Sequence, residues 1–120
     1  MVDLHVQIER FVLDHQPPII ECALIDAGGQ RHTFIDKVWM FSEQTLDARS
    51  EYPVPGLIRC SVMLTWCEIG GRELVRINTA DPDQIESIEG ISEFIVFRDQ
   101  VSPQVNDSTR ATPQSSRNDR

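Results

Sequence analysis

The chain has 120 residues, a net charge of −8 and three cysteines. Residues 1–100 carry 17 acidic against 8 basic side chains, so this part would repel nucleic-acid phosphates and attract a basic protein. No apolar run approaches the roughly 20 residues of a membrane span, and the first residues lack a signal-peptide pattern. Three cysteines are too few for a disulfide framework, so we expect a cytoplasmic protein with reduced thiols.

The first 13 residues alternate apolar and polar side chains, which is typical of a half-buried strand. The apolar positions are even up to Ile8 and odd from Phe11 onward. This change of phase predicts a β-bulge near residues 9 and 10 that bends the strand. Pro17 and Pro18 should end it, because proline cannot donate a hydrogen bond to a neighbouring strand.

Runs of the same period predict further strands at about residues 19–26, 30–41, 57–68, 73–79, 84–88 and 92–98. Between the second and third of these runs we expect one helical turn at residues 42–47, capped by Ser42, and a loop that contains Pro53 and Pro55. Residues 101–120 are rich in Ser, Pro, Asn and Gln and predict a disordered polar tail. Residues 1–100 therefore predict a single all-β domain: about seven antiparallel strands in hairpins that form a small barrel or bent sandwich.

Gly28 and Gly29 join two alternating runs. A phosphate-binding glycine loop would require a helix after it, but a strand is expected here, so the pair predicts a two-residue hairpin turn. That register places Asp26 opposite Arg31. It also predicts that side chains from both strands share one face: Ile19, Ala23, Ile25, His32, Phe34 and Val38.

The same register sets Glu21 opposite Asp36. Two carboxylates that face each other across a ladder repel. We therefore favour a shifted register or a solvated sheet edge over a cation held between them. Gly70 and Gly71 predict a second hairpin of the same kind, in which the residues expected in the core are Val62, Leu64 and Trp66, opposite Val75, Ile77 and Thr79.

Catalytic and metal-binding patterns are weak in this sequence. Cys60 and Cys67 are seven residues apart, which is not a metal-ligand spacing. A nucleophilic combination of Cys22, His32 and Asp36 is conceivable, but the predicted register places Cys22 on the opposite face of the sheet from the other two. We expect no catalytic residue, no metal and no cofactor, and hence not an enzyme. The single lysine, Lys37, argues against nucleic-acid binding.

The most distinctive feature is an acidic run between Arg76 and Arg98, an interval without any basic residue. Its carboxylates are Asp81, Asp83, Glu86, Glu89 and Glu93. They could simply be solvated charges on an edge hairpin, where they prevent aggregation. We interpret them instead as the contact site of a non-catalytic protein-binding module, an inhibitor, immunity-type antidote or adaptor for a basic partner.

Two alternative functions remain open on the sequence alone. A small barrel can hold one small molecule in its interior, and Glu21, His32 and Asp36 could then form a polar mouth with hydrolase or isomerase chemistry. Single-stranded nucleic-acid binding is a third possibility, to be recognised by an affinity that falls steeply with salt. The sequence fixes neither the order of the strands nor the oligomeric state.

Overall fold

A computed structural model describes residues 1–14 and 16–103 of the chain. The structure is all-β apart from two short 3-10 turns, which confirms the predicted class. Its elements in order are β1 (Val2–Leu13), β2 (Ile19–Ile25), β3 (Arg31–Lys37), η1 (Val38–Met40), β4 (Val54–Cys67), β5 (Glu73–Asn78), β6 (Glu93–Phe97), η2 (Arg98–Gln100) and β7 (Val101–Pro103). No helix in these described ranges is long and apolar enough to cross a membrane.

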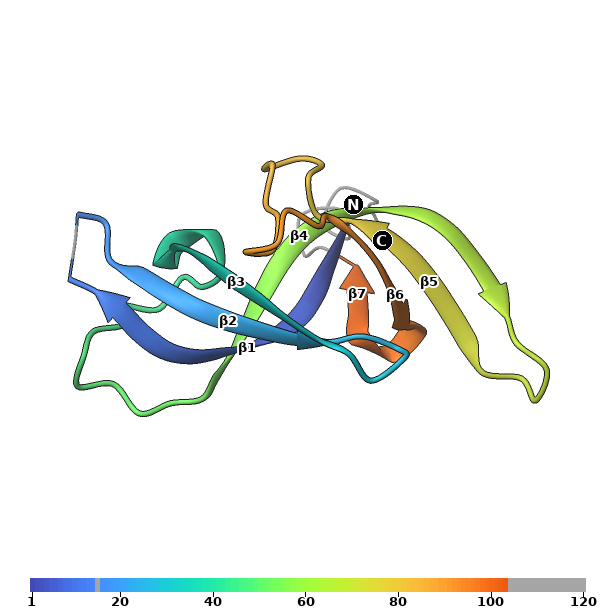
Figure 1. Cartoon of the computed structure of the whole chain (residues 1–120), viewed down its shortest axis with the longest axis horizontal. Coiled ribbons are helices and arrows are strands. Elements are labelled where there is room, and N and C mark those ends of the chain that lie inside the picture. Colours follow the sequence, from blue (N-terminus) through green and yellow to red (C-terminus); the bar gives the residue numbers. More distant parts are fainter. Residues whose placement is uncertain (15, 104–120) are drawn as a thin grey trace, which may run out of the picture.

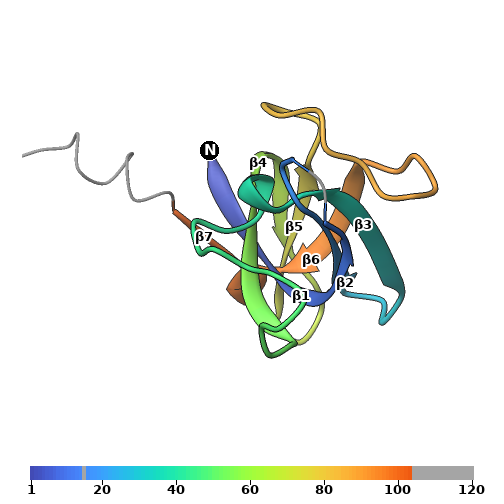
Figure 2. The same cartoon turned by 90° about the vertical axis from the view of Figure 1, so that its left-hand side faces the viewer.

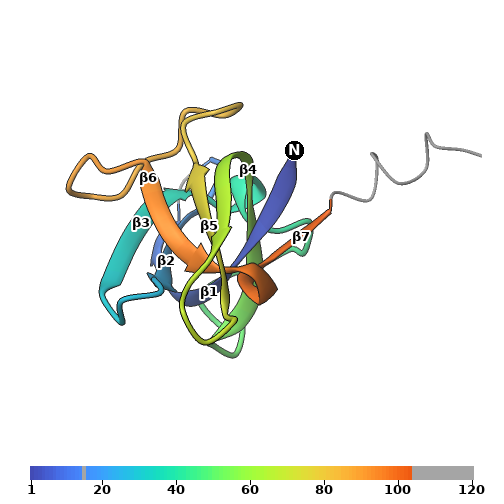
Figure 3. The same cartoon turned by 90° about the vertical axis from the view of Figure 1, so that its right-hand side faces the viewer.

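The strands form one antiparallel sheet in the order β3-β2-β1-β4-β5-β6, and β7 pairs with β1. The sheet is curled into a half-barrel (Figure 1), and the views from its two ends show the strands wrapped around a common axis (Figures 2 and 3). The long strand β1 pairs with β4 through residues 2–8 and with β2 through residues 7–13. The predicted bulge is present between Ile8 and Arg10.

The core lies on the inner face of this curved sheet. Fully buried side chains from different strands meet there, among them Leu4, Ile8, Ile20, Phe34, Ile58 and Ile77. Gly56 of β4 allows β1 and β4 to pack closely, because a Cβ atom at this position would lie 2.9 Å from Cγ1 of Ile8. The inner face is thus filled by apolar side chains.

The number of strands agrees with the prediction, but one member differs. Residues 84–88 are not a strand and belong to a loop, residues 79–92, between β5 and β6. The seventh strand is β7, which lies within the predicted tail. Val101 is buried and pairs with Leu4, so the prediction of a tail from residue 101 is wrong for these three residues. The remaining tail, residues 104–120, lies outside the described residues.

The predicted helical turn at residues 42–47 is not formed, and a 3-10 turn occurs slightly earlier, at Val38–Met40. Ser42 does act as a local cap, since its Oγ accepts a hydrogen bond from the Gln44 N–H at 3.0 Å. Pro55 lies inside β4 rather than in the loop before it. Phe41 pairs with the edge of β4 at this point, because its carbonyl accepts a hydrogen bond from the N–H of Leu57.

The first glycine hairpin has a three-residue loop instead of the predicted two. The Asp26 N–H donates to the Gln30 carbonyl at 2.9 Å, the Gly29 N–H donates to the Asp26 carbonyl at 3.0 Å, and Gly29 has a φ of +85°. A three-residue turn that ends in a left-handed glycine is the next most common hairpin loop. The register consequently shifts by one residue, so Arg31 lies opposite Ile25 and not Asp26.

This shift removes the predicted carboxylate repulsion, as we had favoured. Glu21 lies opposite Ile35, and Asp36 lies opposite Ile20. The shift also exchanges the faces of β2. Its buried residues are Ile20, Cys22, Ala23 and Leu24, whereas Ile25 is exposed and Ile19 is only partly buried. His32, Phe34 and Val38, which were predicted to share a face, are all buried.

The second hairpin also has a three-residue loop, closed by a hydrogen bond of 3.0 Å from the Glu68 N–H to the Arg72 carbonyl. Leu64 lies opposite Arg76 and Trp66 opposite Leu74, with a bulge between Val62 and Leu64. Trp66 is partly buried, but Val62 and Leu64 are exposed. The prediction that this face lies in the core is correct for Val75, Ile77 and Thr79, which are buried. It is wrong for Val62 and Leu64, which lie beyond Cys60, the last residue of β4 that pairs with β1.

Candidate protein-interaction surface

The loop of residues 79–92 projects from the barrel, in yellow and orange at the top of Figure 1. Its base is fixed by Thr79 and Ile85, both of which are buried. The Thr79 Oγ1 donates to the Ile85 carbonyl at 2.7 Å, and the Ile85 N–H donates to the Thr79 carbonyl at 3.1 Å. Buried apolar and hydrogen-bonded groups therefore hold the loop where it leaves the sheet.

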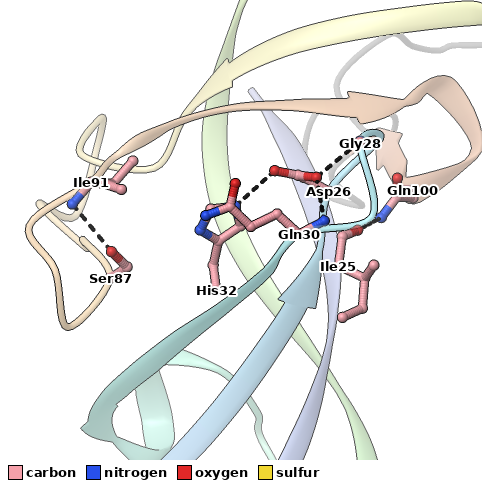
Figure 4. Close-up of polar contacts among 8 residues, drawn as sticks. All are labelled: Ile25, Asp26, Gly28, Gln30, His32, Ser87, Ile91 and Gln100. Atoms are coloured by element: carbon pink, nitrogen blue, oxygen red, sulfur yellow. Dashed lines mark hydrogen bonds and ion pairs between the residues drawn. The ribbon is translucent and has the colours of Figure 1, made fainter.

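The tip of the loop is closed by Ser87, which is itself buried. Its Oγ accepts hydrogen bonds from the N–H groups of Glu89 and Ile91 at 3.3 and 3.2 Å, and the second of these bonds is drawn in Figure 4. Its backbone N–H donates to the Ile91 carbonyl, and its carbonyl accepts the N–H of Gly90. These internal bonds restrain the backbone of the short turn.

The loop is also tied to the opposite side of the half-barrel. The Ile88 N–H donates to the Thr33 carbonyl of β3 at 2.9 Å, and the Ala27 N–H of the first hairpin donates to the Ile95 carbonyl of β6, also at 2.9 Å. The rings of His32 and Phe94 meet edge to face, with centroids 4.7 Å apart. We call this seam, between β3 with its hairpin loop and β6 with the loop 79–92, the barrel seam.

A buried polar pair lies at the barrel seam. The Nε2 of His32, a side chain that is 5% exposed, lies 2.8 Å from Oδ2 of Asp26 (Figure 4). The Oδ1 of Asp26 accepts the N–H groups of Gly28 and Gln30, each at 2.9 Å. Partial burial raises the pKa of Asp26, but the hydrogen bonds from His32 and from these two amides outweigh burial and leave the pKa below its usual value.

Sequence reasoning missed this pair because the predicted register assigned Asp26 to Arg31. Arg31 instead binds Glu9, with Nη2 and Oε1 3.0 Å apart. A usable signal was present: an aspartate two residues before a glycine is a common Asx turn, in which the side chain accepts backbone N–H groups. That motif would have predicted the three-residue loop.

The five predicted contact residues fall into two groups. Arg59 binds Asp83 through Nη2 and Nε at 2.9 and 3.2 Å, and Arg76 binds Glu93 at 2.7 Å. The other three, Asp81, Glu86 and Glu89, are exposed and form no ion pair within the described part of the chain. Of the five predicted contact residues, these three are therefore the ones that no arginine neutralises in the described part of the chain.

Apolar side chains accompany the three unpaired carboxylates. Ile88, next to Glu89, is 64% exposed, and Ile91 is also exposed. Ile88 was predicted to lie in a strand, at residues 84–88, and neither isoleucine was predicted to be part of the surface. Since Ser87 faces inward and anchors the turn, its neighbour Ile88 is presented at the tip.

The predicted ligand site does not assemble. Glu21 binds Arg10, with Oε1 and Nη2 3.0 Å apart, and it lies on the opposite face of the sheet from His32, as the pairing of Glu21 with Ile35 requires. Asp36 accepts the N–H of Lys37 at 2.8 Å. Along β3 the fully buried Phe34 separates Asp36 from His32.

Cys22 lies on the inner face, opposite Phe34, and so shares a face with His32. The prediction that the two lie on opposite faces is wrong. Burial, followed by the nearby charges of Glu21 and Glu9, raises the pKa of Cys22 far above its usual value, which keeps the thiol protonated and a poor nucleophile. In residues 1–14 and 16–103, no three His, Cys, Asp or Glu side chains are grouped as metal ligands.

A shallow groove of about 890 Å³ lies on the outer face of β1 and β4. Its lining includes His5, Leu57 and the exposed Trp39, and Asp83 connects it to the loop 79–92. The groove is open and carries both charge signs. It therefore extends the surface around the loop without forming an enclosed ligand pocket.

Comparison with known proteins gives no further guide to this surface. No family model, no curated protein and no solved structure matches the chain. Function is therefore inferred from the geometry of the loop 79–92 and the groove beside it.

Proposed function

We propose that the protein is a non-catalytic binding module that docks a basic protein through the loop 79–92. The observation that carries this proposal is the composition of a rigid, projecting tip. The exposed Ile88 stands there among unpaired carboxylates, with Glu86 and Glu89 on either side of it in the chain.

Each part of this surface has a separate role in association. Unpaired carboxylates attract a basic partner over a distance and accelerate encounter. An exposed apolar side chain at the centre supplies contact area that is buried on docking. The internal hydrogen bonds of Ser87 reduce the entropy lost on binding, because the tip is ordered beforehand.

The partner that fits this tip has an apolar depression rimmed by lysine or arginine. A module of this kind would act as an inhibitor, an immunity-type antidote or an adaptor. We place it in the cytoplasm, because its three cysteines are free and Cys22 and Cys60 are buried as thiols. The dispersal of Glu21, His32 and Asp36 and the apolar filling of the inner face argue against the small-molecule alternative.

The test requires the partner first. The full chain serves as bait in a lysate of its source organism, and mass spectrometry identifies what co-elutes. The purified partner is then measured by surface-based kinetics against wild type, the double variant Glu86→Lys/Glu89→Lys, and the single variant Ile88→Ala.

A matched control reverses two exposed glutamates elsewhere, Glu51→Lys/Glu73→Lys, which changes the net charge equally. We expect the loop variant to slow association about tenfold at low salt and the difference to shrink as salt rises, while the control changes little. Ile88→Ala should mainly speed dissociation. If both double variants slowed association equally, net charge and not the loop would be the cause, and the proposal would be wrong. Binding that is unchanged in the loop variant would also refute it.

A further inference from the structure

One stretch of β4 has an open edge. β1 pairs with β4 only as far as Cys60, and β5 pairs with residues 61–67. β1 and β5 are the two neighbours of β4 in the sheet, on its two sides. On the edge of β4 that β1 pairs with up to Cys60, residues Ser61 to Cys67 therefore have no neighbouring strand within residues 1–14 and 16–103.

The open edge presents backbone groups that only another chain segment could pair. The Glu68 N–H donates to Arg72 across the hairpin, and N–H directions alternate along a strand. Trp66 therefore donates toward β5, and the N–H groups of Thr65 and Cys67 point outward from the open edge. The β4–β5 arm extends away from the half-barrel, at the right of Figure 1, so this edge is accessible.

The side chains along this edge are unusual for an edge strand. Val62, Met63 and Leu64 are 44%, 48% and 56% exposed, and residues 61–67 contain no charged side chain in a protein of net charge −8. Edge strands normally carry charges that prevent pairing with another chain, and contiguous exposed apolar residues mark interaction sites. The bulge between Val62 and Leu64 leaves the last four residues, 64–67, regular.

We propose that this edge is where two copies of the chain associate, by antiparallel pairing of their β4 strands. The segment is uncharged, so two copies can approach here without the repulsion that their net charges impose elsewhere. The nearest charged residue on one side is Glu68, which follows Cys67 directly, and on the other side Arg59, which is already paired with Asp83. Antiparallel pairing centred on Thr65 keeps Glu68 of one copy away from Glu68 of the other, whereas in-register parallel pairing would bring the two carboxylates together.

The test compares the oligomeric state of matched variants by sedimentation velocity over a range of protein concentrations. Wild type should sediment as a dimer. Leu64→Lys, at an exposed site, should fold normally by circular dichroism and sediment as a monomer, because it places two positive charges near the two-fold axis. The control Ile88→Lys, at an isoleucine of similar exposure on the loop 79–92, should remain a dimer.

A second measurement locates the contact without disturbing it. Thr65→Cys in a Cys67→Ser background places one thiol near the centre of the pairing, where antiparallel Cα atoms lie about 4.5 to 5.5 Å apart, so mild oxidation should cross-link the dimer. A monomeric wild type, a dimer that survives Leu64→Lys, loss of the dimer in Ile88→Lys, or failure to cross-link would each overturn the proposal. It does not depend on the proposed partner of the loop 79–92.

Discussion

The two glycine hairpins have loops of the same length and different surroundings. Each contains an acidic residue two positions before Gly-Gly, and each closes with a three-residue loop and left-handed glycine. The first hairpin lies in the barrel seam, where Ala27 donates to Ile95 of β6. The second extends from the half-barrel, with Ile69 at its tip fully exposed.

The acidic residue accounts for part of this difference. The short side chain of Asp26 accepts backbone N–H groups from its own turn and contacts His32. Glu68, one methylene longer, makes no side-chain hydrogen bond within the described ranges. Local sequence thus sets the geometry of the loop, and neighbouring strands determine whether the hairpin contributes to the core.

Matched leucines should show the largest contrast between the hairpins. Leu24 of the first is fully buried and Leu64 of the second is exposed. Leu24→Ala should lower the free energy of unfolding by about 3 kcal/mol, and Leu64→Ala by less than about 1 kcal/mol. Urea denaturation measures both, and a comparable loss at the two sites would show that the second hairpin is covered in solution.

The acidic residues should differ next. Asp26→Ala removes the acceptor of two backbone N–H groups and leaves the buried His32 unsatisfied, so we expect a loss of about 2 kcal/mol. Glu68→Ala should change stability by no more than about 0.5 kcal/mol. Thermal unfolding of wild type and both variants measures this difference. Equal unfolding midpoints for the two variants would contradict the role assigned to Asp26.

Gly29 and Gly71, the last residue of each loop, should respond alike to substitution, because both have a left-handed backbone conformation. Gly29 and Gly71 have φ values of +85° and +92°, and a Cβ atom at either would meet no atom within 4 Å. Gly29→Ala and Gly71→Ala should therefore each cost about 1 kcal/mol, from backbone strain alone. A much larger cost at Gly29 would mean that the barrel seam also constrains the glycine itself.

The smallest effect concerns pH. The folded pKa of Asp26 lies below its unfolded value, so its contribution to stability is present above the unfolded value of about 3.9 and is lost as pH falls through the folded value. Asp26→Asn keeps a turn-forming side chain but cannot titrate. The stability difference between wild type and this variant should shrink below about pH 4, and a constant difference across that range would exclude linkage through Asp26.

Sequence periodicity located six of the seven strands in the described residues but not their register. The phase change between Ile8 and Phe11 correctly located a bulge, because side-chain alternation is a direct property of the strand. The loop length of a hairpin depends on the conformation of one or two residues, and an error of one residue exchanges the faces of a strand. This is why Ile25 and Cys22 were assigned to the wrong sides.

The candidate surface was predictable only in part. The acidic run marks the loop 79–92, but the arginines that neutralise Asp83 and Glu93 come from β4 and β5, and such contacts are not visible in sequence. Leu64 and Trp66 form an apolar alternation that predicts burial. They are poorly covered because the pairing of β4 with β1 stops at Cys60. The point at which this pairing stops depends on the tertiary structure.

The position of β1 has a consequence for how the protein is made. Its residues 2–4 lie between residues 58–60 of β4 and residues 101–103 of β7, so β1, which is synthesised before the other described strands, is the last to be flanked on both sides. Contacts this distant in sequence form slowly. A growing chain can complete the β2–β3 hairpin early while the apolar side chains of β1 remain uncovered, and in that interval it offers a strand to chaperones or to other nascent chains.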